Sequence, residues 1–257
     1  AHAKKMGLIK DSLDLSHPKY KKWFYEKCLH LMQKYGVNHY KWDKAGDGVN
    51  PHFMTLLQIG KKLKKYDPKL FINVTVGTWP SPFWLNHIDS TWRTGTADVG
   101  WCGVGDDREQ WLTYRDWACY TKFVKQGPLF PLNSVMHHGL VAGRHYQAVK
   151  VTKAGVNMKN AARSFFGTGA NLQELYLTPG LMTQEAWDYV AEAAKWSKKN
   201  AKLLVDSHWV GGDPRELGVY GWACWSKKKS VLTLRNSSNQ SSELSIDLTK
   251  TLEVPKG

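Results

Sequence analysis

Two spacings of apolar residues alternate along this chain. Over residues 20–35 they recur every three to four positions, as on a helix with one buried face. Pro18 in the first turn and Gly36 after the last fit the two ends of such a helix. Residues 37–43 and 70–79 are short apolar runs, the second rich in β-branched side chains, and both predict strands.

The alternation continues to about residue 204. Helices are predicted over residues 18–35, 51–66, 108–126, 153–166 and 183–204, and strands over 6–15, 37–43, 70–79, 90–99, 132–139 and 172–177. About six strand–helix units in series favour a parallel α/β architecture, which is either a barrel or an open sheet.

The period changes after Asp206. Short strands separated by polar turns are predicted over residues 218–225, 230–236 and 243–248. In the last of these, apolar residues alternate with polar ones, which is typical of a half-exposed antiparallel sheet. We therefore expect two domains, a (β/α) domain over residues 1–205 and a small antiparallel β domain over residues 206–257.

The chain is strongly basic, with a net charge of +14 over 257 residues. Nucleic acid, a membrane surface or an acidic glycan could each explain this charge. The lysines cluster on predicted helices, however, so solvated helix faces are the favoured explanation and no nucleic-acid partner is expected. No apolar run reaches the ~18 residues that would span a bilayer.

Two carboxylates accompany predicted strand ends. Asp43 closes the Lys41-Trp42-Asp43 segment just before a Gly-rich loop, and Asp98 lies near the end of the predicted strand 90–99. Chemistry in barrel enzymes gathers at such ends, although an Asp after a strand can also be a helix N-cap or a turn residue. Asp89 is a rival acid that precedes its strand.

Aromatic and imidazole side chains flank both acids. The chain has thirteen tryptophans, and Trp79, Trp84 and Trp101 lie in the loops beside the acids, where an indole face could stack on a pyranose ring. Core burial of each is an equally open alternative. His137 and His138 are adjacent, so only one can face a pocket, and a structural role is also open.

The four cysteines are scattered and form no Cys-x-x-Cys pair, so no zinc site is predicted. Cys28 and Cys119 fall on apolar helix faces and are expected to be buried thiols. The role of Cys102 is open. No metal and no organic cofactor are predicted.

With strands that end near Asp43, Asp98 and His137, the chain resembles the α-galactosidase-like glycoside hydrolases of family 36 and its clan relative, family 27. The resemblance covers about residues 10–235 and rests on an ordered series of short segments: Leu13-Asp14-Leu15, Tyr35-Gly36-Val37, Lys41-Trp42-Asp43, Trp92-Arg93 with Ala97-Asp98, Met136 with His137 or His138 and then Arg144, and Thr178-Pro179-Gly180.

The resemblance implies a retaining α-glycoside hydrolase, of α-galactosidase or α-N-acetylgalactosaminidase type, that acts by double displacement on an oligosaccharide or glycoconjugate. Asp43 would be the nucleophile and Asp98 the acid/base. Lys41 lies two residues from Asp43 on the same strand face and would favour its anion. Arg93 would hydrogen-bond sugar hydroxyls, with a structural salt bridge as the alternative.

The implied fold is a (β/α)8 TIM barrel followed by an antiparallel C-terminal β domain. The family's barrel has eight strands, and the first two find no place before Met6, so we expect a partial barrel whose partner is a missing N-terminal part of the same protein. The family's Gly-rich, Cys-containing segment between the two acids is replaced here by residues 77–82.

A second class of function is a carbohydrate-binding protein without turnover, a barrel whose pocket has degenerated. A basic nucleic-acid-binding protein is a third, but it would interleave lysines with aromatic side chains on one surface. The site-like residues here are instead acidic and follow strands. We expect a secreted or periplasmic location, although no signal peptide is visible in the sequence.

Overall fold

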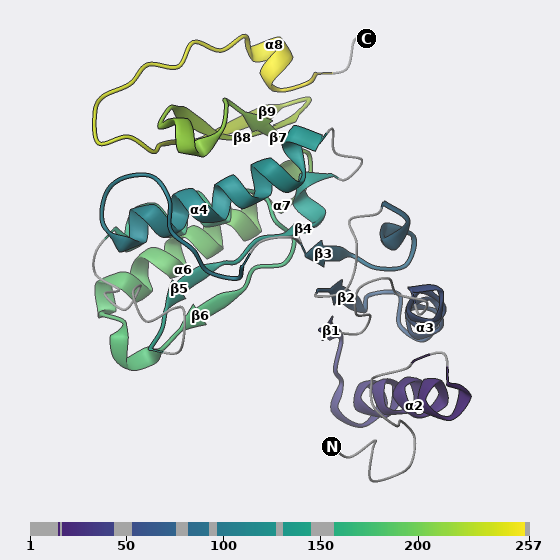
Figure 1. Ribbon diagram of the computed structural model, residues 1–257. Coiled ribbons are helices and arrows are strands. Elements are labelled where there is room, and N and C mark those ends of the chain that lie inside the picture. The colour runs from purple at the N-terminus through teal and green to yellow at the C-terminus, as the bar shows by residue number, and fades with distance from the viewer. Residues whose placement is uncertain are drawn as a thin grey trace. The chain divides into compact units, whose positions relative to one another are not determined.

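The fold was obtained as a computed structural model, which describes residues 15, 17–43, 53–75, 82–92, 97–126, 131–144 and 157–254 (Figure 1). The chain divides into two compact units, Ala1–Thr94 and Gly95–Gly257. This division was not predicted from the sequence.

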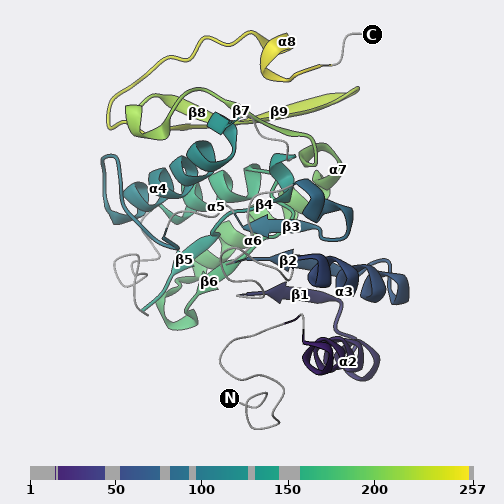
Figure 2. The same cartoon turned by 45° about the vertical axis from the view of Figure 1, so that its right-hand side comes forward.

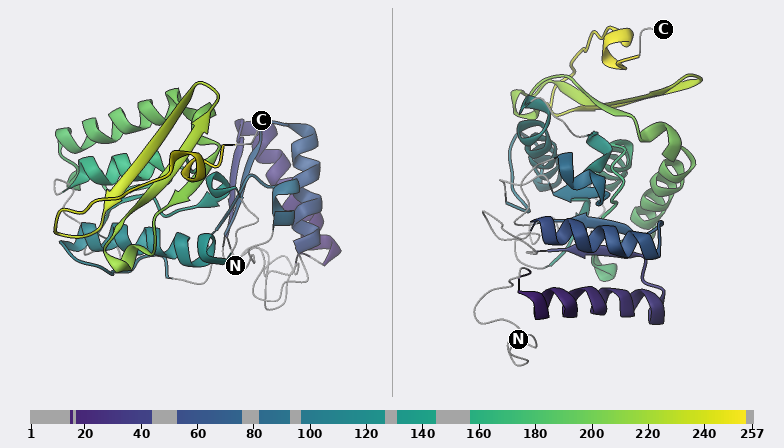
Figure 3. Two further views of the ribbon diagram at one scale, coloured as in Figure 1. Left: turned by 90° about the horizontal axis from the view of Figure 1, so that it is seen from above. Right: turned by 90° about the vertical axis from the view of Figure 1, so that its right-hand side faces the viewer.

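The first unit is a parallel α/β arrangement. Its elements are α2 (Pro18–Tyr35), β1 (His39–Trp42), α3 (Phe53–Tyr66), β2 (Phe71–Val74), a short 3₁₀ helix (Pro82–Asn86) and β3 (Ser90–Trp92). The three strands pair in parallel in the order β1-β2-β3, with Lys41 opposite Asn73 and Val74 opposite Thr91. Helices α2 and α3 lie side by side (Figure 3).

One face of this sheet packs on the helices. The ring of Trp42 meets Phe24 of α2 edge-on, with 5.6 Å between centroids, and the hydroxyl of Tyr40 donates to the Cys28 carbonyl at 2.6 Å. Trp42 therefore points into the helix layer, as the alternation predicts, and Lys41 and Asp43 belong to the opposite face. Gly36 ends α2 in the left-handed conformation, with φ of 67°.

The second unit combines helices with two small sheets (Figure 2). Strands β5 (Leu140–Ala142) and β6 (Leu175–Leu177) pair in parallel, and β7 (Ser207–Val210), β8 (Val219–Ser226) and β9 (Lys229–Asn236) form an antiparallel sheet with β8 at its centre. The remaining elements are α4 (Asp107–Lys122), β4 (Val135–Met136), α5 (Met158–Gly167), α6 (Gln184–Lys199), α7 (Ala201–Leu204), α8 (Leu248–Thr251) and 3₁₀ helices at Val124–Gln126, Leu132–Ser134, Pro179–Leu181 and Pro214–Glu216.

Buried charged groups join α4 to the antiparallel sheet. Asp116, which is fully buried, accepts from Arg115 Nε and from the Tyr220 hydroxyl, both at 2.8 Å. Arg235 donates to that hydroxyl at 2.7 Å and to the Glu109 carboxylate at 2.7 Å. Burial raises the pKa of Tyr220 well above its ordinary value, so its hydroxyl stays protonated and donates to Asp116.

Most predicted helices are confirmed, whereas several strands are shorter or absent. The strand predicted over 90–99 ends at Trp92, and Asp98 lies in a bend. The strand predicted over 132–139 is a 3₁₀ helix followed by the two-residue β4. Nearly all of the predicted strand 6–15 lies outside the described residues.

Residues 243–248, predicted as a strand, form none. Leu244 and Ile246 pack instead on a small cluster that contains Val210, Ala223 and Leu252. The alternation of apolar and polar residues in this segment therefore reflects side chains that pack on a sheet face, and the backbone does not pair as a strand. The antiparallel sheet begins at β7. Residues on both sides of the predicted boundary at residue 206 belong to the second unit.

A parallel α/β architecture and a C-terminal antiparallel sheet are thus present, and closure into an eight-stranded barrel stays a prediction. Within the described ranges, no helix combines the length and the apolar character that a membrane span requires.

Candidate functional site

Polar side chains line the sheet face of the first unit that is turned away from α2 and α3. Asn73 Nδ2 donates to Ser90 Oγ at 2.9 Å, and Thr75 Oγ1 donates to Asp43 Oδ1 at 2.7 Å. Asn73 is fully buried, and its Oδ1 has no hydrogen-bond partner among the described residues. Burying polar groups costs free energy, so such a face is better explained by a site than by packing.

Asp43 stands directly after β1. The Thr75 amide donates to the Trp42 carbonyl at 3.0 Å, which continues the β1–β2 pairing as far as the site. The neighbouring strand thereby orients the Asp43 carboxylate through the Thr75 hydroxyl, while the side chain remains exposed. Residues 44–52, which lead to α3, lie outside the described residues, so the N-cap alternative for Asp43 is not tested.

Asp89, the rival acid, has a structural role. Its carboxylate accepts from Lys64 Nζ at 2.6 Å and from the Ile72 amide at 2.8 Å. It therefore ties α3 to the start of β2, at the end of the sheet opposite Asp43.

Asp98 belongs to the second unit, in the segment that precedes α4. Its side chain is 68% exposed. The hydroxyl of Tyr114, on α4, donates to the carbonyl of Ala97 at 2.8 Å. The same ring lies against Gly100, where an added Cβ would come within 2.4 Å of it. Packing on α4, rather than strand pairing, thus holds the Asp98 segment.

His138 lies between two carboxylates. Its Nε2 is 3.3 Å from Asp98 Oδ1, and its Nδ1 is 3.7 Å from Glu174 Oε2. At Gly139, an added Cβ would stand 1.6 Å from the Glu174 carbonyl oxygen, so only glycine permits the backbone approach that places Glu174 beside His138. The Tyr176 hydroxyl donates to Glu174 Oε2 at 2.8 Å.

Sequence reasoning missed Glu174 and Tyr176. The available signal was a carboxylate inside the apolar run 172–177, at the start of a predicted strand. Among the described residues, no three histidine, cysteine or acidic side chains gather in an arrangement that could hold a metal ion.

The two adjacent histidines point to different surroundings. His137 is fully buried, with its Nε2 3.9 Å from Cys119 Sγ and its ring edge-on to Trp222. His138 meets Asp98 instead. The two side chains therefore leave the chain in different directions, and the contacts of His137 are those of a residue packed in the core.

The three candidate tryptophans and Arg93 fall into three groups. Trp84 is only 4% exposed and belongs to the core of the first unit, so core packing accounts for it and no indole face is left for a sugar. Trp101 is half-buried against the core of the second unit. Trp79 and Arg93 lie outside the described residues.

Cys102, whose role the sequence leaves open, is partly buried. Burial raises the pKa of the Cys102 thiol to about 11, so it is not an ionised nucleophile at neutral pH.

Removing the Tyr114 hydroxyl tests how the Asp98 segment is held. We expect Tyr114→Phe to lose a hydrogen bond worth about 1 kcal/mol and to loosen residues 97–100 while α4 stays folded. Faster amide hydrogen exchange confined to this segment would show it. Tyr120→Phe, on the same helix, serves as the control, and unchanged exchange in Tyr114→Phe would contradict the anchoring role.

Comparisons with known proteins show which class of fold this is. No family model and no curated protein sequence matches the chain. Solved structures do match, and glycoside hydrolases are among them. One is an α-amylase from Anoxybacillus, with 11% sequence identity and a TM-score of 0.53 over 88% of this chain and 54% of that chain.

Within that class, the chain shares its fold with family 36 α-galactosidases. The α-galactosidase AgaB from Geobacillus stearothermophilus matches 84% of the chain with 13% identity and a TM-score of 0.56. The galactosidase domain of the α-galactosidase-sucrose kinase AgaSK also matches 84%, with 15% identity and a TM-score of 0.55. This chain spans only 29% and 28% of those two proteins, respectively.

Proposed function

We propose that this chain carries catalytic residues of a retaining α-glycoside hydrolase, of α-galactosidase or α-N-acetylgalactosaminidase type. The observation that carries the proposal is the placement of Asp43. It follows a parallel strand directly, is oriented by Thr75 of the next strand, and stands on a sheet face lined with polar side chains. In α/β barrels this is the end of the sheet where chemistry occurs.

In the proposed reaction, a carboxylate oxygen of Asp43 attacks the anomeric carbon and forms a glycosyl ester. Asp98 donates its proton to the departing glycosidic oxygen. The resulting Asp98 carboxylate then takes a proton from water, which attacks the anomeric carbon and releases Asp43. Lys41 lies two residues before Asp43, on the same strand face. Retaining enzymes place the two carboxyls about 5–5.5 Å apart.

His138 and Glu174 would position the acid/base. His138 Nε2 stands 3.3 Å from Asp98 Oδ1, and Glu174 lies near the other ring nitrogen. An imidazole held in this way restricts the rotation of an otherwise exposed carboxylate. It also offers a proton-bearing neighbour during the two proton transfers.

The acid/base role is tested by Asp98→Ala in the full-length protein. We expect a loss of about 10²–10⁴-fold on natural linkages and a much smaller loss on activated aryl α-glycosides, whose leaving groups need no proton. Azide should partly restore turnover by attacking the glycosyl-enzyme, giving a glycosyl azide of retained configuration detectable by NMR. Asp89→Ala, at the structural acid, should show neither the leaving-group dependence nor the azide effect.

Inverted sugar released by the unmutated enzyme would refute double displacement. A protein that binds α-glycosides without any turnover would support the alternative of a degenerate carbohydrate-binding barrel instead.

A further inference from the structure

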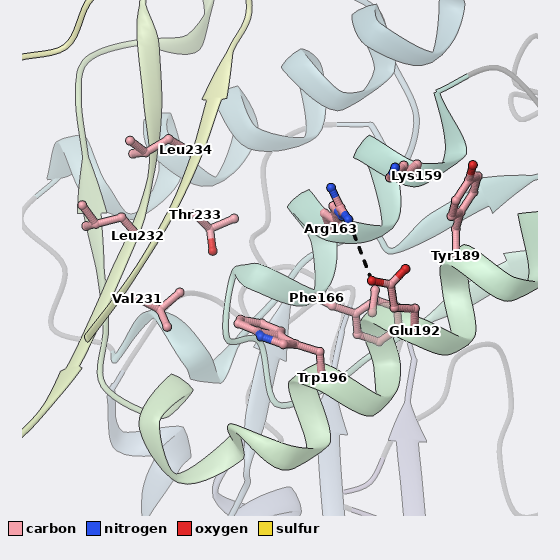
Figure 4. A pocket seen from close by; sticks show the side chains of 11 residues that line it. Lys159, Arg163, Phe166, Tyr189, Glu192, Trp196, Val231, Leu232, Thr233 and Leu234 are labelled. Carbon is pink, nitrogen blue, oxygen red and sulfur yellow. Dashed lines mark ion pairs between the residues drawn. The ribbon is translucent and has the colours of Figure 1, made fainter. Parts of the chain in front are cut away.

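A groove of about 400 Å³ runs between two helices and a strand of the second unit. Helices α5 and α6 provide one side, and β9 provides the other (Figure 4). Its size falls within the usual range for small-ligand sites, about 300–1,000 Å³. The lining residues used below are Arg163, Phe166, Glu192, Trp196 and Thr233.

The groove has an aromatic floor. Trp196 is 36% exposed, and its indole extends from α6 across the lower end of the groove in Figure 4. Phe166 of α5 is buried beside it. Gly167 lets β9 come close to the end of α5, because a Cβ there would lie 2.4 Å from Thr233 Cγ2. An indole face that is partly open, next to buried apolar surface, suits a flat apolar ligand surface.

Polar groups stand above this floor. Arg163 Nη2 lies 3.8 Å from Glu192 Oε1, and both side chains are more than half exposed. Further along, Lys159 Nζ lies 5.5 Å from the centre of the Tyr189 ring. An exposed ion pair contributes little to stability, whereas a neighbouring guanidinium and carboxylate offer donors and acceptors that vicinal hydroxyls can use together.

We propose that this groove is a carbohydrate-binding site separate from the catalytic residues. A pyranose ring would place its C–H face on Trp196 and its hydroxyls on Arg163 and Glu192. The combination of an aromatic face with paired donors and acceptors matches a sugar, which is apolar on its faces and polar around its edge. The proposal goes beyond the catalytic function, because none of these residues takes part in it.

The groove binds without hydrolysing. Glu192 is the one carboxylate among the described residues that line it, and it is paired with Arg163. Double displacement and direct displacement by water both need two carboxyl groups. The site would therefore hold an oligosaccharide chain rather than cleave it.

The helix α6 supplies a matched control. Trp187 and Trp196 are both 36% exposed, but only Trp196 lines the groove. Trp196 follows Trp187 by nine residues, and at about 100° per residue this separation places the two side chains on opposite faces of the helix. A general effect of losing a surface tryptophan should be the same for both, whereas an effect on the groove should follow Trp196 alone.

The test is calorimetric titration of melibiose and of maltotriose into the full-length protein carrying Asp43→Asn, which suppresses hydrolysis. We expect Trp196→Ala to weaken binding of at least one probe about tenfold or more, equivalent to about 1.4 kcal/mol. Trp187→Ala should leave it unchanged. Glu192→Gln, a change at an exposed side chain that keeps its volume, should weaken the same binding about threefold.

Three results would overturn the proposal. The first is that neither melibiose nor maltotriose binds. The second is that Trp196→Ala and Glu192→Gln leave the affinity unchanged. The third is that Trp187→Ala weakens binding as much as Trp196→Ala does. Groove binding should also persist in Asp98→Ala, whereas a sugar bound only at the catalytic residues should respond to that change. Failure of the groove is therefore distinguishable from failure of the proposed hydrolase function.

Discussion

Substituting Asp43 with asparagine is expected to lower kcat on α-glycosides by at least about 10³-fold, because an amide cannot form the glycosyl ester. The fold should persist, since Asp43 is exposed and contributes one described hydrogen bond, from Thr75. Initial rates on nitrophenyl α-glycosides, combined with circular dichroism of the full-length protein, provide the measurement. Asp67→Asn, at an aspartate that caps a turn in the same unit, is the control and should keep its activity.

The smaller variant Asp43→Ala adds a stereochemical readout. Azide should enter the space of the missing carboxylate and attack the anomeric carbon directly, which gives a glycosyl azide of inverted configuration. A variant of Asp43 with near-normal kcat would show that the nucleophile lies elsewhere. It would also remove the main support for the hydrolase proposal.

Replacing Asp116 with alanine is expected to cost about 3–5 kcal/mol of unfolding free energy. The carboxylate is fully buried and accepts from Arg115 and from Tyr220. Without it, the buried Arg115 guanidinium loses its counter-charge and the Tyr220 hydroxyl loses its acceptor. Because these contacts join α4 to the antiparallel sheet, the loss should separate the two rather than perturb α4 alone.

Thermal unfolding monitored by near-ultraviolet circular dichroism should show this as a fall in Tm of roughly 10 °C or more. Tyr220→Phe should cost less, about 1–3 kcal/mol, because only the hydroxyl between Asp116 and Arg235 is lost. Asp188→Ala, at an exposed position of α6, should change stability by less than about 0.5 kcal/mol. A Tm for Asp116→Ala equal to that of Asp188→Ala would disprove a stabilising role for the network.

Part of the candidate site could be predicted from the sequence. The position of Asp43 after a strand, with Trp42 turned into the helix layer, follows from the alternation of side chains along one short segment. Glu174 was missed because its role depends on a backbone approach at Gly139, which no local pattern reveals.

The sequence by itself determined most of the helices, the parallel character of the first strands and the antiparallel character of the last ones, and the strand face that carries Lys41 and Asp43. These depend on periodicities within single segments, where neighbouring residues set the backbone. Only the tertiary structure decided that Asp98 sits in a bend under Tyr114, that Trp84 is core, and that residues 243–248 pack without pairing. Those outcomes depend on surfaces contributed by residues far away in the chain, and burial against such surfaces overrides the local pattern.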